Sequence, residues 1–426
     1  MTLILFSMFF ALLILGVPIF ITLILPSLTV VGLQHMDTMI VIQRMVGGLD
    51  KSSILAVPFF MFCAEVMSVG QIGRRLINLA KAFLGHLPGG IAIATVVACT
   101  IFGAISGAGS AAVVAIGAIV YEMMKDSHYD TDFSSGVILT SSTLAMLIPP
   151  SIAYVLYSTI TLDSIKALFM SGMEAGLICC VALVIYSYIY AKKKNFEVLP
   201  KANWKERWKA LKESLLSLGM IVIILGGIYG GLCTAMEAAA LAVVYAIVVE
   251  VIIYRSITLK QAFYMAVRSG RSIAMVMILI AAGSVLSWVI TAQQIPQKLI
   301  ASMSGASKVE VLLLINVVFM VAGMFVDPNS AIIVLTPLVQ PLAVSFGVDS
   351  VHLATIVVIN LAIGMLTPPF GMNLFIGINV FKKDYGAILK GVIPCMIICL
   401  LLLICFTFIP EMSLAFPQWF VGYQPR

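Results

Sequence analysis

Residues 144–151 read Leu-Ala-Met-Leu-Ile-Pro-Pro-Ser and place two consecutive prolines inside an otherwise apolar stretch. Proline has no N–H to donate to the carbonyl four residues earlier, and its ring clashes with that carbonyl, so this pair must break or kink a helix. Pro149 and Pro150 would leave the carbonyls of Ala145 and Met146 without their usual partners. The stretch therefore predicts a broken helix with free oxygens beside the break.

A second stretch of the same kind covers residues 361–373, Leu-Ala-Ile-Gly-Met-Leu-Thr-Pro-Pro-Phe-Gly-Met-Asn. Its proline pair, Pro368 and Pro369, begins 219 positions after Pro149 and would free the carbonyls of Gly364 and Met365. A lipid bilayer offers such groups no hydrogen bond, so a break at membrane depth persists only inside protein or beside a watery cavity. A bound cation would also satisfy these oxygens.

The composition indicates a polytopic membrane protein, because 62% of the residues are hydrophobic and 10% are charged, against about 25% charged in soluble domains. The net charge of +6 is concentrated in residues 192–212. A basic run can bind nucleic acid, but between two membrane segments it is more typical of a cytoplasmic loop that follows the positive-inside rule. We therefore expect a lipid bilayer around the chain and no nucleic-acid partner.

Two short polar segments predict re-entrant hairpins. Residues 106–110, Ser-Gly-Ala-Gly-Ser, precede about 11 apolar residues, which is too few for a crossing of about 20 residues. Their counterpart is Met-Phe-Val-Asp-Pro-Asn-Ser at residues 324–330. Gly103 and Gly323 match at a separation of 220, close to that of the proline pairs. The chain is therefore an internal duplication, all-α, with about 11 transmembrane helices, two re-entrant hairpins and two broken helices.

Duplicated halves with helices broken near mid-membrane are typical of secondary transporters, in which unwound carbonyls hold Na⁺ and half-helix N-termini face anions. Free carbonyls supply the hard oxygen ligands that Na⁺ prefers. Helices that begin near Ser151 and Phe370 would favour an anionic substrate. We therefore expect Na⁺ and a small anion to bind at the two breaks.

The other function classes fit less well. An intramembrane enzyme needs a nucleophile with a base, or paired acids, and no Gly-x-Ser-x-Gly or His-anchored pair is present in the sequence. The eight cysteines and four histidines form no Cys-x-x-Cys or His-Glu-x-x-His motif. A channel that does not couple to sodium remains the alternative, although channels more naturally repeat a filter around a symmetry axis. We therefore expect a transporter and no enzyme.

Several motifs, together covering nearly the whole chain, resemble the large membrane (M) subunit of tripartite ATP-independent periplasmic (TRAP) transporters of the C4-dicarboxylate and sialic acid type. They lie at residues 43–50 (Gln-Arg-Met-Val-Gly-Gly-Leu-Asp), 56–60, 85–90, 102–107, 148–151, 226–229, 234–239 and 323–373. The sequence departs from the common pattern at Ala108 and Ala112, where members often carry hydroxyls, and at residues 234–237, Thr-Ala-Met-Glu.

This resemblance implies Na⁺-coupled uptake of an organic acid across the bacterial inner membrane by an elevator mechanism. It also implies a small four-helix membrane subunit and a soluble periplasmic substrate-binding protein as separate partners. The expected substrate contacts are Ser106, Ser151, Asp327 and Asn373. The expected sodium ligands, mostly backbone carbonyls, are Ser106, Ala145, Met146, Pro149, Gly323, Gly364, Met365, Thr367 and Pro369.

The expected division of the chain has five parts. Residues 1–90 form membrane helices and an interfacial arm of the scaffold, and residues 91–172 form the first transport repeat. Scaffold helices with the basic loop 192–214 cover residues 173–308, the second transport repeat covers 309–391, and a C-terminal membrane helix covers 392–426. Within this plan we expect residues 2–31 to form one retained membrane helix, Glu65 to pair with Arg74 or Arg75, and Glu237 to cap a helix start.

Overall fold

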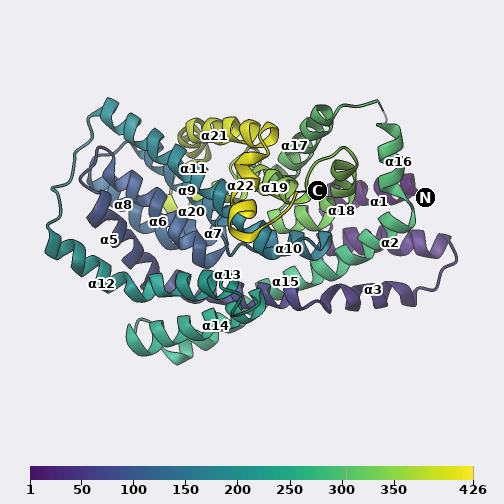
Figure 1. Cartoon of the computed structure of the whole chain (residues 1–426), viewed down its shortest axis with the longest axis horizontal. Coiled ribbons are helices and arrows are strands. Elements are labelled where there is room, and N and C mark those ends of the chain that lie inside the picture. Colours follow the sequence, from purple (N-terminus) through teal and green to yellow (C-terminus); the bar gives the residue numbers. More distant parts are fainter. Residues whose placement is uncertain (304, 426) are drawn as a thin grey trace.

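The computed structural model describes residues 1–303 and 305–425, and those residues form helices and connecting loops without any strand. Within these described residues, nine helices or continuous helical runs are long and apolar enough to cross a membrane, and six further apolar helices have 10–17 residues. The molecule is elongated, with α1–α3 at one end and α5, α8 and α12 at the other (Figure 1). The predicted all-helical, multi-pass membrane fold is confirmed, although some of the apolar helices are shorter than the roughly 20 residues of a full crossing.

The N-terminal end differs from the single helix expected over residues 2–31. Gly16 has a positive φ of 71° and Pro18 precedes the next helix, so the chain reverses there and the two halves pack against each other. The chain then continues through a helix that packs on α15. The elements of this end are α1 (Thr2–Ile14), α2 (Ile19–Leu33), α3 (Met39–Leu49), the 3₁₀ turn η1 (Ser52–Leu55), α4 (Ala56–Val69) and α5 (Ile72–Leu84).

Two helical hairpins and two broken helices follow the sequence repeat, as predicted. The first hairpin comprises α6 (Gly90–Ser106), α7 (Gly109–Ala112), the π-helical turn η2 (Val113–Gly117) and α8 (Ala118–Asp126); its broken helix comprises α9 (Thr131–Leu147) and α10 (Ile152–Thr161). The second hairpin comprises α17 (Lys308–Phe325) and α18 (Pro328–Ser345); its broken helix comprises α19 (Ser350–Gly364) and α20 (Met372–Phe381). Residues 133–159 and 351–366 are buried throughout, so the broken helices lie at the centre of the molecule.

The two repeats exchange the second halves of their broken helices. α10, from the first repeat, packs on α18 of the second hairpin, whereas α20, from the second repeat, packs on α7, η2 and α9 of the first. Figure 1 shows α20 beside α9 and α10 beside α18. Each hairpin is therefore covered by a helix from the other half of the chain.

The remaining helices surround this centre. α11 (Ile165–Lys194) packs on α6 and α9, and α21 (Tyr385–Phe408) packs on α9. The 34-residue helix α15 (Leu259–Ala292) contacts α2, α3, α4 and α18. The other elements are α12 (Trp204–Ile221), η3 (Val222–Gly226), α13 (Gly227–Tyr229), α14 (Ala235–Ile247), η4 (Val248–Ile253), α16 (Ile295–Ser302) and α22 (Glu411–Val421).

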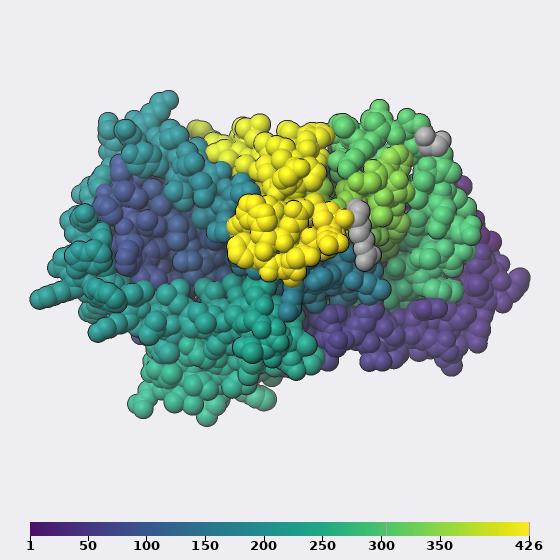
Figure 2. Space-filling view, in the orientation of Figure 1, coloured from purple at the N-terminus to yellow at the C-terminus, as the bar shows by residue number. Residues whose placement is uncertain are grey.

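Two of the expected domain boundaries fall inside continuous helices. The boundary between residues 172 and 173 falls inside α11, and the boundary between 391 and 392 falls inside α21. Both helices pack on the broken helix α9. The C-terminal part also holds a second helix, α22, which covers the middle of one face (Figure 2). Its Phe416 N–H donates to the buried Glu174 of α11, at 3.0 Å.

Three acidic residues pair with or cap helices. Glu65 pairs with Arg268 of α15 at 3.2 Å, so the expected pairing with Arg74 or Arg75 is wrong. Glu237 caps α14 in a capping box with Thr234, as expected. Glu250, which the sequence did not single out, is fully buried and caps α5 from η4, because its carboxyl group accepts the backbone N–H groups of Gln71 and Ile72 at 3.1 and 3.0 Å.

We expect Glu250→Ala to destabilise the protein by about 2–5 kcal/mol, because it leaves the buried Ile72 N–H, the part-buried Gln71 N–H and the Ser256 hydroxyl without their acceptor. Thermal unfolding of the detergent-solubilised protein measures this loss. The exposed Glu122 provides the matched control, and Glu122→Ala is expected to unfold with the wild-type midpoint. Equal midpoints for the two variants would contradict the proposed role of Glu250.

Candidate functional site

Each hairpin touches its own broken helix through a glycine. A Cβ atom on Gly103 of α6 would lie 2.5 Å from the Cα of Ala145 in α9, and a Cβ on Gly323 of α17 would lie 3.0 Å from the Cα of Gly364 in α19. Only a residue without a side chain allows backbones to approach so closely. Ala145 and Gly364 are the residues four positions before each proline pair. The two halves of the chain therefore build the same contact twice.

The first break is short and partly open. Ile148 and Ser151 are extended, and the Ser151 hydroxyl donates to the carbonyl of Met146 at 2.5 Å. The Met146 carbonyl is therefore satisfied, contrary to the expectation that both carbonyls are free. No hydrogen bond reaches the Ala145 carbonyl from any residue that the structure describes. The Ala145 oxygen is thus an open acceptor beside the hairpin.

The tip of the first hairpin lies directly on this break. Gly107 has a positive φ of 59°, and a Cβ atom there would lie 2.4 Å from the carbonyl oxygen of Pro150 and 3.3 Å from the Cα of Ser151. Ser106 is the last residue of α6, immediately before this glycine. The structure therefore places the hairpin tip against Pro150 and Ser151, with Ser106 one position before the tip.

The second break is longer and more closed. The Gly364 carbonyl accepts the N–H of Thr367 at 3.0 Å, and the Met365 carbonyl accepts the N–H of Asn373 at 3.1 Å. Both expected free carbonyls are therefore hydrogen-bonded, because the loop 365–371 turns back far enough to bring its own Thr367 N–H and the Asn373 N–H at the start of α20 within reach. The Pro369 carbonyl accepts the hydroxyl of Tyr385 at 3.1 Å. One open backbone acceptor on this side is the Gly323 carbonyl, which no described donor reaches.

Two buried side-chain oxygens near the first hairpin have no partner among the described residues. They are the Ser106 hydroxyl and the Asn373 amide oxygen. The Asn373 amide nitrogen donates to the Ser142 hydroxyl of α9 at 3.2 Å, and a Cβ on Gly109 of α7 would lie 3.2 Å from the Ser142 carbonyl. Such orphaned polar atoms are rare in native proteins and call for an explanation. These two oxygens are therefore available as acceptors for a ligand.

Sequence reasoning missed Ser142. The available signal was the run Thr140-Ser141-Ser142-Thr143, four consecutive hydroxyl residues between the apolar stretches 136–139 and 144–148. In the structure the other hydroxyls of this run mostly bond their own helix, as Ser141 does to Val137. Only the contact with Asn373, 231 positions away, distinguishes Ser142 from its neighbours.

Asp327 occupies the tip of the second hairpin as the N-cap of α18. Its carboxyl group accepts the backbone N–H of Ser330 at 3.1 Å and also the Ser330 hydroxyl. No contact in the described chain joins Asp327 to Ser106, Ser151 or Asn373. The capping role is thus visible in the structure, and the substrate contact remains a prediction.

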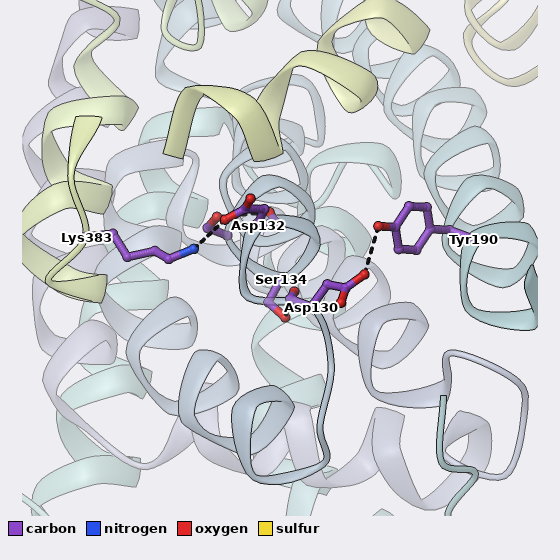
Figure 3. A network of polar contacts seen from close by, with 6 residues as sticks. Asp130, Asp132, Ser134, Tyr190 and Lys383 are labelled. Carbon is purple, nitrogen blue, oxygen red and sulfur yellow. Dashed lines mark hydrogen bonds and ion pairs between the residues drawn. The ribbon is translucent and has the colours of Figure 1, made fainter. Parts of the chain in front are cut away.

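Polar contacts join the ends of the two broken helices. Lys383, after α20, pairs with Asp132 at the start of α9 at 2.8 Å, and the Tyr190 hydroxyl of α11 donates to Asp130 at 3.0 Å (Figure 3). At the other end, Asp163, after α10, accepts the hydroxyl of Ser350 at the start of α19. The end of each broken helix is therefore bound to the beginning of the other, which holds both breaks in one unit.

The chain matches a protein-family model described as "Tripartite ATP-independent periplasmic transporter, DctM component" over residues 6–412. It is 40% identical to the ectoine/5-hydroxyectoine TRAP transporter large permease protein of Ruegeria pomeroyi over 95% of both chains. It is 38% identical to the C4-dicarboxylate TRAP transporter large permease protein of Pseudomonas aeruginosa over 87% of both. It is 34% identical to the sialic acid TRAP transporter large permease protein of Vibrio cholerae over 89% and 90% of the two chains.

Among solved structures, the fold is similar to that of the YdaH transporter of Alcanivorax borkumensis, with a TM-score of 0.62. The match covers 90% of this chain and 88% of that one, at 12% sequence identity. At this identity the likeness concerns the fold alone.

Proposed function

The chain belongs to the DctM family of large permease subunits of TRAP transporters, and from this premise we propose that it carries an organic acid across the bacterial inner membrane by coupling the movement to Na⁺. It is a permease and not an enzyme. The observation that carries the proposal is the duplicated contact of Gly103 with Ala145 and of Gly323 with Gly364.

Sodium coupling is supported by the open backbone oxygens beside these contacts. The carbonyls of Ala145 and Gly323 face no described donor, and Ser106 adds a buried hydroxyl without a partner. Oxygen ligands of this kind suit a hard cation, and broken transporter helices hold Na⁺ in this way. We assign one Na⁺ to each hairpin and its break, with the hydrogen-bonded carbonyls of Met146, Gly364 and Met365 in secondary roles.

An organic acid is supported by the helix starts and by the relatives. α10 begins after Ser151 and α20 begins after Gly371, and helix N-termini stabilise anions. The relatives named above are permeases for ectoine, C4-dicarboxylates and sialic acid, all of which carry a carboxylate. Ala108 and Ala112 remove two hydroxyls from the first hairpin tip, which favours a substrate that needs fewer hydrogen bonds there.

An elevator movement is supported by the interlocked repeats. The exchanged helices α10 and α20, together with the polar contacts at both ends of the broken helices, make α6–α11 and α17–α22 one candidate moving body. The helices α1–α5 and α12–α16 form the candidate scaffold. The basic loop after α11 lies on the cytoplasmic side by the positive-inside rule. The proposed partners are a small four-helix membrane subunit and a periplasmic substrate-binding protein.

Reconstitution into liposomes tests this proposal. We expect uptake of a radiolabelled acid only when both partner proteins and an inward Na⁺ gradient are present, with at least about a tenfold loss when K⁺ replaces Na⁺. A thermal-shift screen of the periplasmic protein against carboxylates identifies the acid to be used. A channel, the alternative function, would conduct without the periplasmic protein and without the Na⁺ gradient.

A further inference from the structure

A cavity of about 620 Å³ lies between α3 and α15 on one side and α10 and α18 on the other. Its size suits a small organic molecule, since ligand pockets commonly measure about 300–1,000 Å³. The polar part of its wall consists mainly of Gln43, Arg44, Lys51, Thr159, Ser287 and Trp288. None of the predicted substrate contacts at the hairpins and breaks lines it. The cavity is therefore a separate space between the candidate scaffold and the candidate moving body.

The cavity is positively charged. Arg44 and Lys51 line it, no carboxyl group does, and neither cation has an ion pair in the described residues. The Arg44 guanidinium lies 5.4 Å from the centre of the Trp288 ring, a cation–π contact that restrains its position. The Ser284 hydroxyl donates to the Arg44 carbonyl at 2.8 Å and fixes the backbone as well. An oriented guanidinium without a counter-charge is a natural partner for a carboxylate.

Lys51 joins the two sides of the cavity. Its ammonium group donates to the carbonyl of Thr159, in the last turn of α10, although the two residues are 108 positions apart. Partial burial lowers the pKa of this ammonium group, because its charged form loses some of its water. A carboxylate in the cavity would give Lys51 a stronger partner than a neutral carbonyl. If Lys51 bound that carboxylate instead of the Thr159 carbonyl, one bond between α10 and the scaffold would be lost.

The cavity lies on the side opposite the basic loop. α9 begins beside Lys194, which pairs with Asp130 at 3.2 Å, and the run Thr131–Thr161 leads away from there to the cavity wall at Thr159. The positive-inside rule places cations near the cytoplasmic loops, so it does not account for Arg44 and Lys51. These two cations have a role other than membrane orientation.

We propose that this cavity is an entry site that binds the carboxylate of a small organic acid through Arg44 and Lys51 before the acid reaches the hairpins. The assignment of the acid as the transported substrate rests on the function proposed above. Binding moves the Lys51 ammonium from the Thr159 carbonyl to the carboxylate, so arrival of the acid releases one bond between scaffold and moving body. Gln43 and Ser287 are placed to accept or donate further hydrogen bonds to the acid.

Fluorescence of Trp288 reports on the cavity directly. The other three tryptophans are exposed, so Trp204→Phe, Trp208→Phe and Trp419→Phe together leave a single reporter. The protein is placed in nanodiscs of neutral phosphatidylcholine and titrated with succinate, ectoine or N-acetylneuraminate, with uncharged succinamide as the control ligand. We expect at least one acid to give a saturable emission change with a dissociation constant of about 1 mM or below, and succinamide to give none.

Two variants in this background sharpen the test. Arg44→Gln removes the charge, and Gly47→Leu fills the cavity from a helical position at which a Cβ meets nothing within 4 Å. We expect both to weaken the response at least about tenfold. Gly270→Leu is the matched control, because Gly270 is also helical with open space around it but does not line the cavity. It is expected to titrate like the parent protein.

Each outcome decides the proposal. The proposal is overturned if no acid changes the emission, or if Arg44→Gln responds to the acid like the parent protein. Phosphatidylglycerol in the nanodisc tests for a lipid occupant. If it changes the emission before any acid is added and then blocks the response to acid, a lipid headgroup occupies the cavity and the proposal is overturned. If sodium-driven uptake in liposomes fails but the acid titration is intact, only the transport function is refuted. The anion site is then still supported.

Discussion

Replacing Gly103 or Gly364 with alanine is expected to lower Na⁺-driven uptake by about 10- to 100-fold. The new Cβ would lie 2.5 Å from the Cα of Ala145 in the first case and 2.6 Å from the Cα of Gly323 in the second. Backbone atoms cannot rotate away as a side chain does, so the hairpin must shift relative to the break. Overpacking of this kind costs about 1–3 kcal/mol, and about 1.4 kcal/mol corresponds to a factor of ten in affinity.

The measurement is initial uptake against Na⁺ concentration in liposomes that contain all three proteins. We expect the Na⁺ concentration for half-maximal uptake to rise, because the shift moves the Ala145 or Gly323 carbonyl away from the ion. Gly270→Ala makes the same change where nothing lies within 4 Å and is expected to behave as wild type. A wild-type Na⁺ dependence in both Gly103→Ala and Gly364→Ala would refute the pairing of each hairpin with its break as a sodium site.

Removing the charge of Asp327 is expected to reduce uptake by about 10- to 100-fold, since hydrogen bonds to charged groups contribute about 1.5–3 kcal/mol. Asp327→Asn is the informative change because Asn and Asp are equally good N-caps. The variant therefore keeps the bond to the Ser330 N–H that starts α18, and lost transport reports on the charge rather than on the helix. Thermal unfolding checks that α18 is intact.

Ser106→Ala is the companion variant at the first hairpin. The Ser106 hydroxyl is buried without a partner, so its removal is expected to leave stability unchanged and to lower uptake by about 3- to 10-fold, as for one neutral hydrogen bond. If Asp327→Asn transports normally, Asp327 serves only as a cap. If Ser106→Ala transports normally, Ser106 touches neither Na⁺ nor substrate.

The breaks and hairpins were predictable because their causes are local. A proline pair removes N–H groups from the helix in which it stands, whatever surrounds it. The repeat of 219 to 220 positions then related the two halves. The free carbonyls were predicted less well. Met146, Gly364 and Met365 found donors in Ser151, Thr367 and Asn373, because the path of the chain beyond each break decides which groups come within reach.

Contacts between distant segments had no comparable signal in the sequence. Glu250 and Gln71 are 179 positions apart, and Asn373 and Ser142 are 231 apart. The sequence predicted a nearby partner for Glu65, whereas the structure pairs it with Arg268. A single Glu or Ser in an apolar helix is equally compatible with a cap, an ion pair or a ligand contact, and only the packing of helices selects among them.

The sequence by itself thus determined that the chain is a duplicated, helical membrane protein with two hairpins and two breaks, since composition and proline chemistry act through neighbouring residues. The tertiary structure alone decided that α10 and α20 exchange places between the repeats, that Gly103 and Gly323 lie on Ala145 and Gly364, and that Arg44 and Lys51 share a cavity. These features depend on which helix faces come together in space, and that choice is made by the packing of the whole chain.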